Sequence, residues 1–276
     1  MGYQDTFQRH ELKYLLSPQQ KSAVFAAMKG HMEGGRFQNS SISNIYFDTP
    51  DFLLIRHSLE KPIYKEKLRM RSYGIAKPDT MVFVELKKKY KSVVYKRRIS
   101  LPLSQTENYL LRDGPGSLGR RGHTYSPSGV GLPPAPPDVS GGAGQMENQT
   151  GAASQIIREI DYFREFYQNL RPALFLSYQR EAFSGIEEPN LRITFDENIL
   201  WRREQLSLAY GPYGAPLLPP GSSLMEIKTP GAMPLWLSHT LSAHGIYKVS
   251  FSKYGKAYGE ILKLQLSHGE DLRHVS

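Results

Sequence analysis

Positively charged residues repeat at every second position over several stretches of this chain. Residues 65–71 read KEKLRMR, which places four cations at i, i+2, i+4 and i+6. Because successive side chains of a β-strand point to opposite faces, this spacing directs all four cations to one face of a sheet. The alternation returns in residues 85–89 and 96–99. A sheet face of like charges is unfavourable unless a polyanion binds to it, so the pattern predicts a site for a chain of phosphates.

The composition fits a globular protein with anionic ligands. The chain has 276 residues, 39% of them hydrophobic, which is enough for a sizeable core in one or two domains. A net charge of +9 favours nucleic acid, a membrane surface or phosphorylated molecules as partners. The absence of cysteine excludes disulfides, thiolate metal sites and cysteine nucleophiles. No apolar run approaches the roughly 18 residues of a membrane span, and we expect a cytoplasmic protein without a membrane segment.

The pattern along the chain predicts about eight antiparallel strands and several helices. Ser17 and Pro18 have the residue types of a helix cap and first turn, so we expect a helix to about residue 32. Residues 112–153 hold 10 Gly and 6 Pro without apolar periodicity, which predicts a flexible insertion within a single domain spanning residues 1–276. Strands are expected over residues 6–16, 43–47, 64–73, 81–90, 93–101, 173–183, 191–200 and 224–228. Further helices are expected over 51–58, from a capping box at 104–107, from 154, over 234–244 and over 252–266.

One face of each predicted strand is charged and the other is apolar. The apolar face can pack against helices, whereas the charged face cannot pack against apolar groups. Closing the sheet into a barrel places the charged faces around a hydrated interior and removes the exposed edges. We therefore expect an α+β fold, a closed antiparallel β-barrel tunnel of about eight strands with helices packed outside. The residues expected to face inwards are Arg9, Glu11, Lys13, Lys65, Lys67, Arg69, Arg71, Glu85, Lys87, Lys89, Lys96, Arg98, Arg180, Arg192, Thr194, Asp196, Glu226 and Lys228.

This inward set combines many cations with a few carboxylates. Arginine forks and lysine ammonium groups suit phosphate oxygens, and carboxylates among them suit a divalent cation that bridges those oxygens. A solvated basic sheet face is the ordinary alternative for any single strand. Glu11 and Glu85 are as consistent with pairing to neighbouring cations as with metal ligation, and Asp196 is as consistent with a salt bridge. Lys88 and Arg97 fall on the opposite parity and are expected to face outwards.

Nine short motifs in order resemble the VTC domain, the polyphosphate polymerase domain of the vacuolar transporter chaperone family. That family is part of the CYTH-like triphosphate tunnel metalloenzyme superfamily. The resemblance covers nearly the whole chain except the insertion. The motifs are FxRxExKY at 7–14, YFDTP at 46–50, KLRxRxYG at 67–74, FVExK at 83–87, KxR at 96–98, YxRxAF at 178–183, RxTxD at 192–196, ExK at 226–228 and SKY at 252–254.

The resemblance implies a metal-dependent phosphotransferase that moves the γ-phosphate of ATP onto a growing inorganic polyphosphate chain inside the tunnel. ATP and polyphosphate would be its partners, and Mn²⁺ or Mg²⁺ its cofactor. The metal would be held by Glu226, with Glu11 as a second candidate. Lys253 and Lys256 would guard one tunnel mouth. The catalytic contacts to nucleotide and polyphosphate would come from Lys13, Arg69, Arg71, Lys87, Lys96, Arg180 and Arg192. Further phosphate contacts would come from Arg9, Lys67, Lys89, Arg98, Lys228, Lys253 and Lys256.

Other functions stay open on the sequence. The wider tunnel group has ExExK on its first strand, and the arginine at position 9 here favours a polymerase over a triphosphatase. An inorganic triphosphatase or polyphosphatase is the nearest alternative, and a non-catalytic polyphosphate or nucleotide sensor is another. Nucleic acid is not expected as a partner, because no RRM, KH or helix-turn-helix signature is present. The eukaryotic polymerases of the family are fused to an SPX domain and membrane helices, which leaves a membrane-associated partner protein open.

Overall fold

The structure is a computed structural model, and it describes residues 10–91, 93–112 and 146–271. The chain divides into two units. Unit 1 comprises the residues up to Ile42, residues 176–202 and the residues from Pro212 onwards. Unit 2 comprises residues 43–175 and 203–211. Two long strands, β2 (Met32–Asp48) and β6 (Arg171–Gly185), begin in one unit and end in the other.

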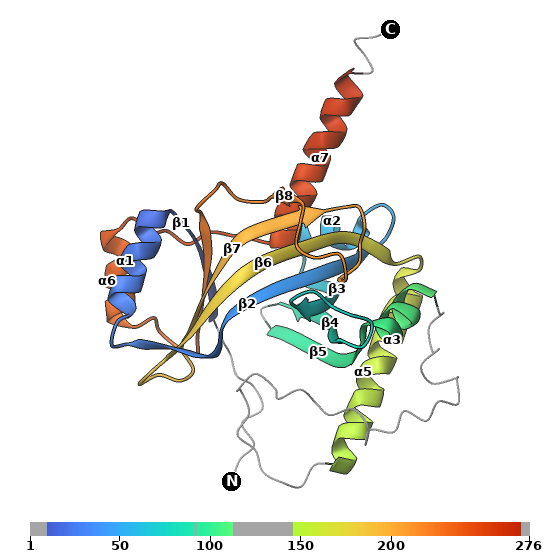
Figure 1. Cartoon of the computed structure of the whole chain (residues 1–276), viewed down its shortest axis with the longest axis horizontal. Helices are drawn as coiled ribbons and strands as arrows, with labels where there is room; N and C mark the ends of the chain where they lie inside the picture. Colours follow the sequence, from blue (N-terminus) through green and yellow to red (C-terminus); the bar gives the residue numbers. More distant parts are fainter. Residues whose placement is uncertain (1–9, 92, 113–145, 272–276) are drawn as a thin grey trace. The chain divides into compact units, whose positions relative to one another are not determined.

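Unit 1 is built from strands with two helices packed on their apolar face. Its helices α1 and α6 lie side by side (Figure 1). Val24 and Met28 of α1 and Leu237 of α6 share one core with Ile193 and Met225 of the strands. The elements are β1 (His10–Leu16), α1 (Pro18–Met28), the first part of β2 (Met32–Asp48), the later part of β6 (Arg171–Gly185), β7 (Arg192–Arg202), β8 (Ala215–Pro216), β9 (Ser223–Thr229), α6 (Leu235–Ala243) and α7 (Lys253–Asp271).

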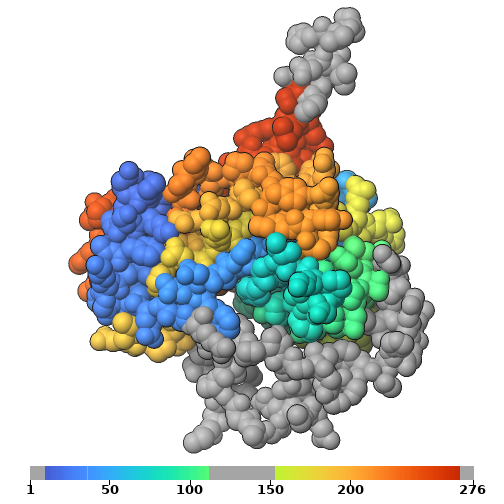
Figure 2. Space-filling view, viewed as in Figure 1, coloured from blue at the N-terminus to red at the C-terminus, as the bar shows by residue number. Residues whose placement is uncertain are grey.

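Unit 2 is an antiparallel meander with a long helix on its apolar face. Leu68, Met70 and Leu86 of the meander are buried against Ile160 and Phe163 of the helix α5. The cyan segment of the space-filling view, which belongs to this meander, forms part of the surface (Figure 2). The elements are the later part of β2, α2 (Leu53–Leu59), β3 (Tyr64–Tyr73), β4 (Met81–Tyr90), β5 (Val93–Pro102), α3 (Leu103–Glu107), the π-helix η1 (Asn108–Arg112), α5 (Met146–Tyr167) and the first part of β6.

The alternation of charged and apolar residues expected from the sequence is present in the strands of both units. In β3, Leu68 and Met70 are each 1% exposed in the core, while Arg69 lies on the other face. In β7, Ile193 and Phe195 are buried in the core of unit 1. The hydrogen-bonded order of the strands is β1-β9-β7-β6-β2-β3-β4-β5, with β8 beside β7. An α+β fold with a large antiparallel sheet is therefore confirmed, whereas closure of the sheet into a tunnel stays a prediction.

The first helix begins as the sequence predicts. The Ser17 hydroxyl accepts a hydrogen bond from the Gln20 amide at 3.2 Å, and the Gln20 side chain accepts one from the Ser17 amide at 3.0 Å. Pro18 occupies the first turn, where its missing N–H costs nothing. The helix ends at Met28 rather than near residue 32, because Gly30 turns the chain with a φ of 78° into the next strand.

Other element boundaries also differ from the prediction. The strand expected at 43–47 is the end of the 17-residue β2, whose first half contains Gly34 and Gly35 and therefore lacks a readable alternation. The predicted capping box at 104–107 lies inside α3, whose cap is Pro102 without a side-chain bond. Helix α5 begins at Met146, within the segment expected as an insertion. Residues 113–145 of that segment lie outside the described residues.

Within the part of the chain that the structure describes, no helix combines the length and the apolar character needed to cross a membrane.

Candidate functional site

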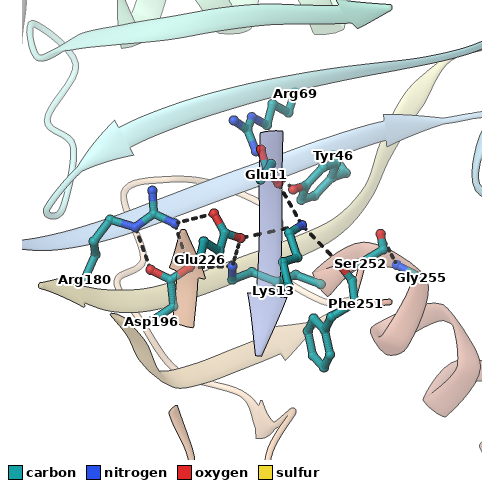
Figure 3. A network of polar contacts seen from close by, with 11 residues as sticks. Glu11, Lys13, Tyr46, Arg69, Arg180, Asp196, Glu226, Phe251, Ser252 and Gly255 are labelled. Atoms are coloured by element: carbon teal, nitrogen blue, oxygen red, sulfur yellow. Dashed lines mark hydrogen bonds and ion pairs between the residues drawn. The ribbon is translucent and has the colours of Figure 1, made fainter. Parts of the chain in front are cut away.

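Two buried carboxylates, one in each unit, are each surrounded by cations. In unit 1 the central carboxylate is Glu226 of β9. Backbone pairing places it opposite Lys13 of β1 on one side and Thr194 of β7 on the other. We define the Glu226 cluster as Lys13, Arg180, Asp196, Glu226 and Lys253 (Figure 3).

Glu226 contacts three cations at moderate distances. Its carboxylate oxygens lie 3.3 Å from the Lys253 Nζ, 3.5 Å from the nearer Arg180 nitrogen and 3.6 Å from the Lys13 Nζ. Burial by itself would raise the pKa of Glu226, but Lys253, Lys13 and Arg180 outweigh it and hold the pKa well below its ordinary value. The carboxylate is therefore ionised at neutral pH, and the nearest of these three cations lies 3.3 Å from it.

Asp196 of β7 holds two of the same cations much more tightly. It is fully buried and accepts two hydrogen bonds from Arg180, at 2.5 and 2.6 Å, and a third from Lys253 at 2.5 Å. Burial alone would lower the pKa of Lys253, but Asp196 and Glu226 raise it, so Lys253 is protonated. From the sequence, Asp196 is as consistent with a salt bridge as with a role as a metal ligand. In the structure it is a salt-bridge partner that fixes the positions of Arg180 and Lys253.

Two features of the Glu226 cluster leave polar atoms that could contact a ligand. Contacts of 3.3–3.6 Å are longer than the 2.7–3.2 Å of an ordinary N–H···O hydrogen bond, so the Glu226 oxygens keep lone pairs for a metal. The Thr194 Oγ1 beside it is buried, and among the described residues it has no hydrogen-bond partner. Glu11, 35% exposed at its side chain, lies 3.1 Å from the Lys13 Nζ.

The described residues of this cluster do not form a metal site by themselves. No group of three or more His, Cys, Asp or Glu side chains within the described ranges could hold a metal ion. Mg²⁺ is often bound by only one or two carboxylates together with substrate phosphates. Glu226 fits that role, and Asp196 does not, because its oxygens are already occupied by Arg180 and Lys253.

In unit 2 the central carboxylate is Glu85 of β4. The antiparallel register places it between Arg69 of β3 and Arg98 of β5. Its oxygens accept hydrogen bonds from the Arg69 Nε at 2.7 Å and the Arg98 Nε at 2.8 Å, and the Lys96 Nζ also lies at 2.8 Å. The Arg71 Nε is 3.8 Å away. We define the Glu85 cluster as Glu85, Arg69, Arg71, Lys96 and Arg98.

Four positive charges thus surround one side chain that is 1% exposed. Burial would raise the pKa of Glu85, but Arg69, Arg71, Lys96 and Arg98 reverse this and hold the pKa far below its ordinary value. Burial lowers the pKa of Lys96, and the attraction of Glu85 opposes that shift. The Glu85 cluster keeps a net positive charge of about three, from four cations and one carboxylate.

Two residues of β2 position the arginines of the Glu85 cluster, and the sequence interpretation missed both. The Tyr46 hydroxyl accepts a hydrogen bond from the Arg69 Nη1 at 3.2 Å, and the Asn44 Oδ1 accepts one from the Arg71 Nε at 2.9 Å. Burial would raise the pKa of Tyr46, but Arg69 and nearby cations lower it overall. Asn44 and Tyr46 are two positions apart on a predicted strand, and this period-two spacing is the signal in the sequence that places both on one face.

Further lysines continue the cationic face of unit 2 along the strands. The strand register places Lys67 opposite Lys87, and Lys87 opposite Lys96 on the next strand. Two residues further along, Lys65 pairs with Lys89. The pKa of Lys65 is lowered, first by burial and then by the positive charges of Lys89, Lys87 and another nearby lysine. Among the described residues no carboxylate lies within salt-bridge distance of Lys65, Lys87 or Lys89.

The remaining predicted site residues lie elsewhere or outside the described ranges. Arg192 is paired with Lys228 across β7 and β9, and the charge of Lys228 helps to lower the pKa of Glu226, whose burial would raise it. Lys256 of α7 is about half exposed and lies 3.9 Å from Glu260. Arg9 lies outside the described residues. The roles predicted for these side chains stay predictions.

The two cations predicted to face outwards do so. Arg97 contacts Glu159 of α5 at 3.1 Å through its Nε, and the Lys88 Nζ lies 3.4 Å from the same carboxylate. Helix α5 covers the apolar face of the meander, so this contact places both cations on the face opposite the Glu85 cluster.

A family model described as the VTC domain matches residues 8–261 of the chain. Comparison with curated proteins gives no match. Among solved structures, a candidate adenylate cyclase from Bacillus halodurans is 15% identical, covers 88% of this chain and 92% of its own, and has a TM-score of 0.42. A candidate adenylyl cyclase from Hippeastrum, described as having a dominant triphosphatase activity, is 16% identical over the same shares, with a TM-score of 0.47. A candidate adenylate cyclase from Vibrio parahaemolyticus is 12% identical, covers 92% of this chain and 97% of its own, and has a TM-score of 0.40.

Proposed function

Because the chain belongs to the VTC domain family, we propose that it is a polyphosphate polymerase, which transfers the γ-phosphate of ATP to the end of an inorganic polyphosphate chain. The observation that carries this proposal is the repetition of cations along β3, β4 and β5. The Glu85 cluster is followed by Lys67 with Lys87, and then by Lys65 with Lys89. A site for a single small anion needs one such group of cations, whereas a linear polyanion can contact several groups in turn.

The chemistry of this transfer needs alignment and charge neutralisation more than it needs proton transfer. The acceptor is the terminal phosphate of the chain, which is already anionic, so no strong general base is required. Arg69, Arg98 and Lys96 are held by Glu85 at fixed positions before any ligand binds. Cations that are oriented in advance stabilise the charge that develops on the transferred phosphoryl group without reorganisation during the reaction.

In unit 1 the corresponding donors are Lys13, Arg180 and Lys253. Asp196 orients the last two, and we assign phosphate oxygens as the ligands of all three. Glu226 would hold a divalent cation together with the phosphates, and the cation would supply further neutralisation of their charge. The Thr194 hydroxyl is in place to donate a hydrogen bond to a ligand beside Glu226.

The products of incubation with ATP and Mn²⁺ test this proposal directly. We expect ADP together with acid-insoluble phosphate chains, and we expect Arg69→Ala to reduce both by orders of magnitude. Arg97→Ala, on the opposite face of the same sheet, is the matched control and should retain activity. Free phosphate without chains would identify a hydrolase instead. Binding of polyphosphate without any turnover would identify a sensor.

A further inference from the structure

Unit 2 contains a cavity that includes no residue of the Glu85 cluster. Its volume is about 220 Å³. Three segments distant in sequence form its wall: the turn after β2, the beginning of β6 and the segment that follows β7. The lining residues that matter below are Phe52, Arg171, Pro172, Arg203 and Leu206.

Two arginines of this cavity, Arg171 and Arg203, are not engaged in an ion pair with any residue that the structure describes. Within the described residues, no carboxylate lies within salt-bridge distance of Arg171 or Arg203. Two acidic groups close to Phe52 in the sequence are engaged elsewhere. Asp48 accepts hydrogen bonds from the backbone amides of Leu54 and Ile55, at 2.8 and 3.0 Å. Asp51 is paired with Arg56.

The backbone around the cavity is held in an unusual conformation. Phe52 has a φ of 60° and a ψ of 36°, the left-handed region that bulky side chains rarely adopt. Backbone hydrogen bonds from the Phe52 amide to the Thr49 carbonyl, and from the Arg56 amide to the Phe52 carbonyl, fix this conformation. Gln205, between two lining residues, has a φ of 47°. Residues held in such conformations cluster at ligand sites, where the surrounding structure imposes them.

The aromatic ring of Phe52 contributes to the site. The Arg203 guanidinium carbon lies 5.3 Å from the centre of this ring, within the range of a cation–π contact. The contact orients one guanidinium group without neutralising it. Phe52, Pro172 and Leu206 are apolar residues that line the same cavity as Arg171 and Arg203, and both arginines are exposed to solvent.

We propose that this cavity binds a small organic monophosphate, with the phosphate held by Arg171 and Arg203 and the organic part against Phe52, Pro172 and Leu206. Both arginines line this cavity, and a guanidinium group matches phosphate oxygens in charge and in fork geometry. The apolar wall gives an organic group its binding surface, which a chain of inorganic phosphates could not use. The site is separate from the proposed transfer reaction and does not depend on it.

Binding of phenyl phosphate and glucose 6-phosphate to the full chain, measured by titration calorimetry without ATP, tests the proposal. We expect a site of one-to-one stoichiometry, weakened at least tenfold by Arg171→Ala and by Arg203→Ala. Arg158→Ala, which removes an exposed arginine of α5 in the same unit, and Arg69→Ala should leave this binding unchanged. Hydrogen–deuterium exchange should show ligand-dependent protection in peptides covering residues 49–56 and 203–209.

Several results would overturn the proposal. Unchanged binding in the Arg171→Ala and Arg203→Ala variants would place the ligand elsewhere, as would loss of binding in Arg69→Ala. Equal affinity for inorganic phosphate would show that the apolar wall contributes nothing. No binding of either organic probe would exclude the cavity as a monophosphate site. If Arg203→Ala lost its fold by circular dichroism, Arg203→Lys would serve, because it keeps the charge and removes the fork, and tenfold weaker binding would again be expected.

Discussion

Glu226 and Asp196 differ in how closely cations bind them, and this difference separates their roles. Asp196 is saturated by short hydrogen bonds, whereas Glu226 is held by three longer contacts. We therefore expect Glu226→Gln to abolish ADP formation while polyphosphate binding is kept or becomes tighter, since one negative charge is lost among cations. Turnover assays and polyphosphate titrations check this. Glu181→Gln, a change at an ion pair with Lys21 elsewhere in unit 1, is the control. Normal turnover with weakened binding would remove Glu226 from the metal site.

Asp196→Asn should act on stability rather than only on catalysis. Breaking a buried ion pair by removing one partner leaves an uncompensated charge and costs about 3–5 kcal/mol. Here two cations, Arg180 and Lys253, would lose their main partner. We expect a decrease of this size in the free energy of unfolding, measured in urea, and activity should fall as well. An unchanged unfolding midpoint would mean that Glu226 alone holds both cations in place.

At the scale of a single strand, alternate residues of β3 have different roles. Substitutions on its apolar face should reduce stability, and substitutions on its charged face should reduce activity. Leu68→Ala or Met70→Ala should cost about 2–5 kcal/mol of stability, because both side chains are fully buried against α5. Arg69→Ala should reduce activity but lower the stability only slightly. The Arg69 side chain is partly exposed, and three other cations remain around Glu85. Urea unfolding and ATP turnover, measured on the same preparations, give both quantities.

The two arginines of this strand, Arg69 and Arg71, differ in burial and in hydrogen bonding. Arg71 is 7% exposed and donates to Asn44, so Arg71→Ala should lose stability as well as activity, unlike Arg69→Ala. Lys88→Ala and Arg97→Ala, on the face that contacts α5, should change turnover little. If these two variants were inactive and Arg69→Ala were active, the assignment of the functional face would be wrong.

For the whole molecule, the two central carboxylates predict how stability depends on pH. The cations around Glu85 and Glu226 outweigh the effect of burial and hold the pKa of each below its ordinary value of 4.5. A depressed folded-state pKa adds stability above the unfolded value, and this stability is lost as the pH falls through the folded pKa. We expect the thermal midpoint to decrease as the pH is lowered from about 4.5, and Glu85→Gln to reduce this pH dependence. A midpoint that stays constant to about pH 3 would contradict the strong pairing.

Much of the fold and of the candidate site could be predicted from the sequence, because period-two alternation is a local signal. It gave β3, β4 and β5 nearly to the residue, and it placed Arg69 and Glu85 on the same face as Lys87. It could not show that Glu85 gathers four cations, since that depends on the register of neighbouring strands. The first half of β2 was missed because its glycines carry no pattern, and the cavity was missed because its wall joins segments far apart in sequence.

The buried Glu85 has a consequence for turnover. Each phosphate oxygen that binds Arg69, Arg98 or Lys96 must compete with a carboxylate that is tethered to the same sheet. The affinity for a polyanion then depends on how much more strongly the cations attract phosphate than they attract the Glu85 carboxylate. This affinity is lower than the same cations would give without Glu85. When a phosphate moves on, the carboxylate restores the pairing at once. In the proposed polymerase reaction, a chain that grows by one unit in each cycle would therefore advance from one group of cations to the next without being trapped at any of them.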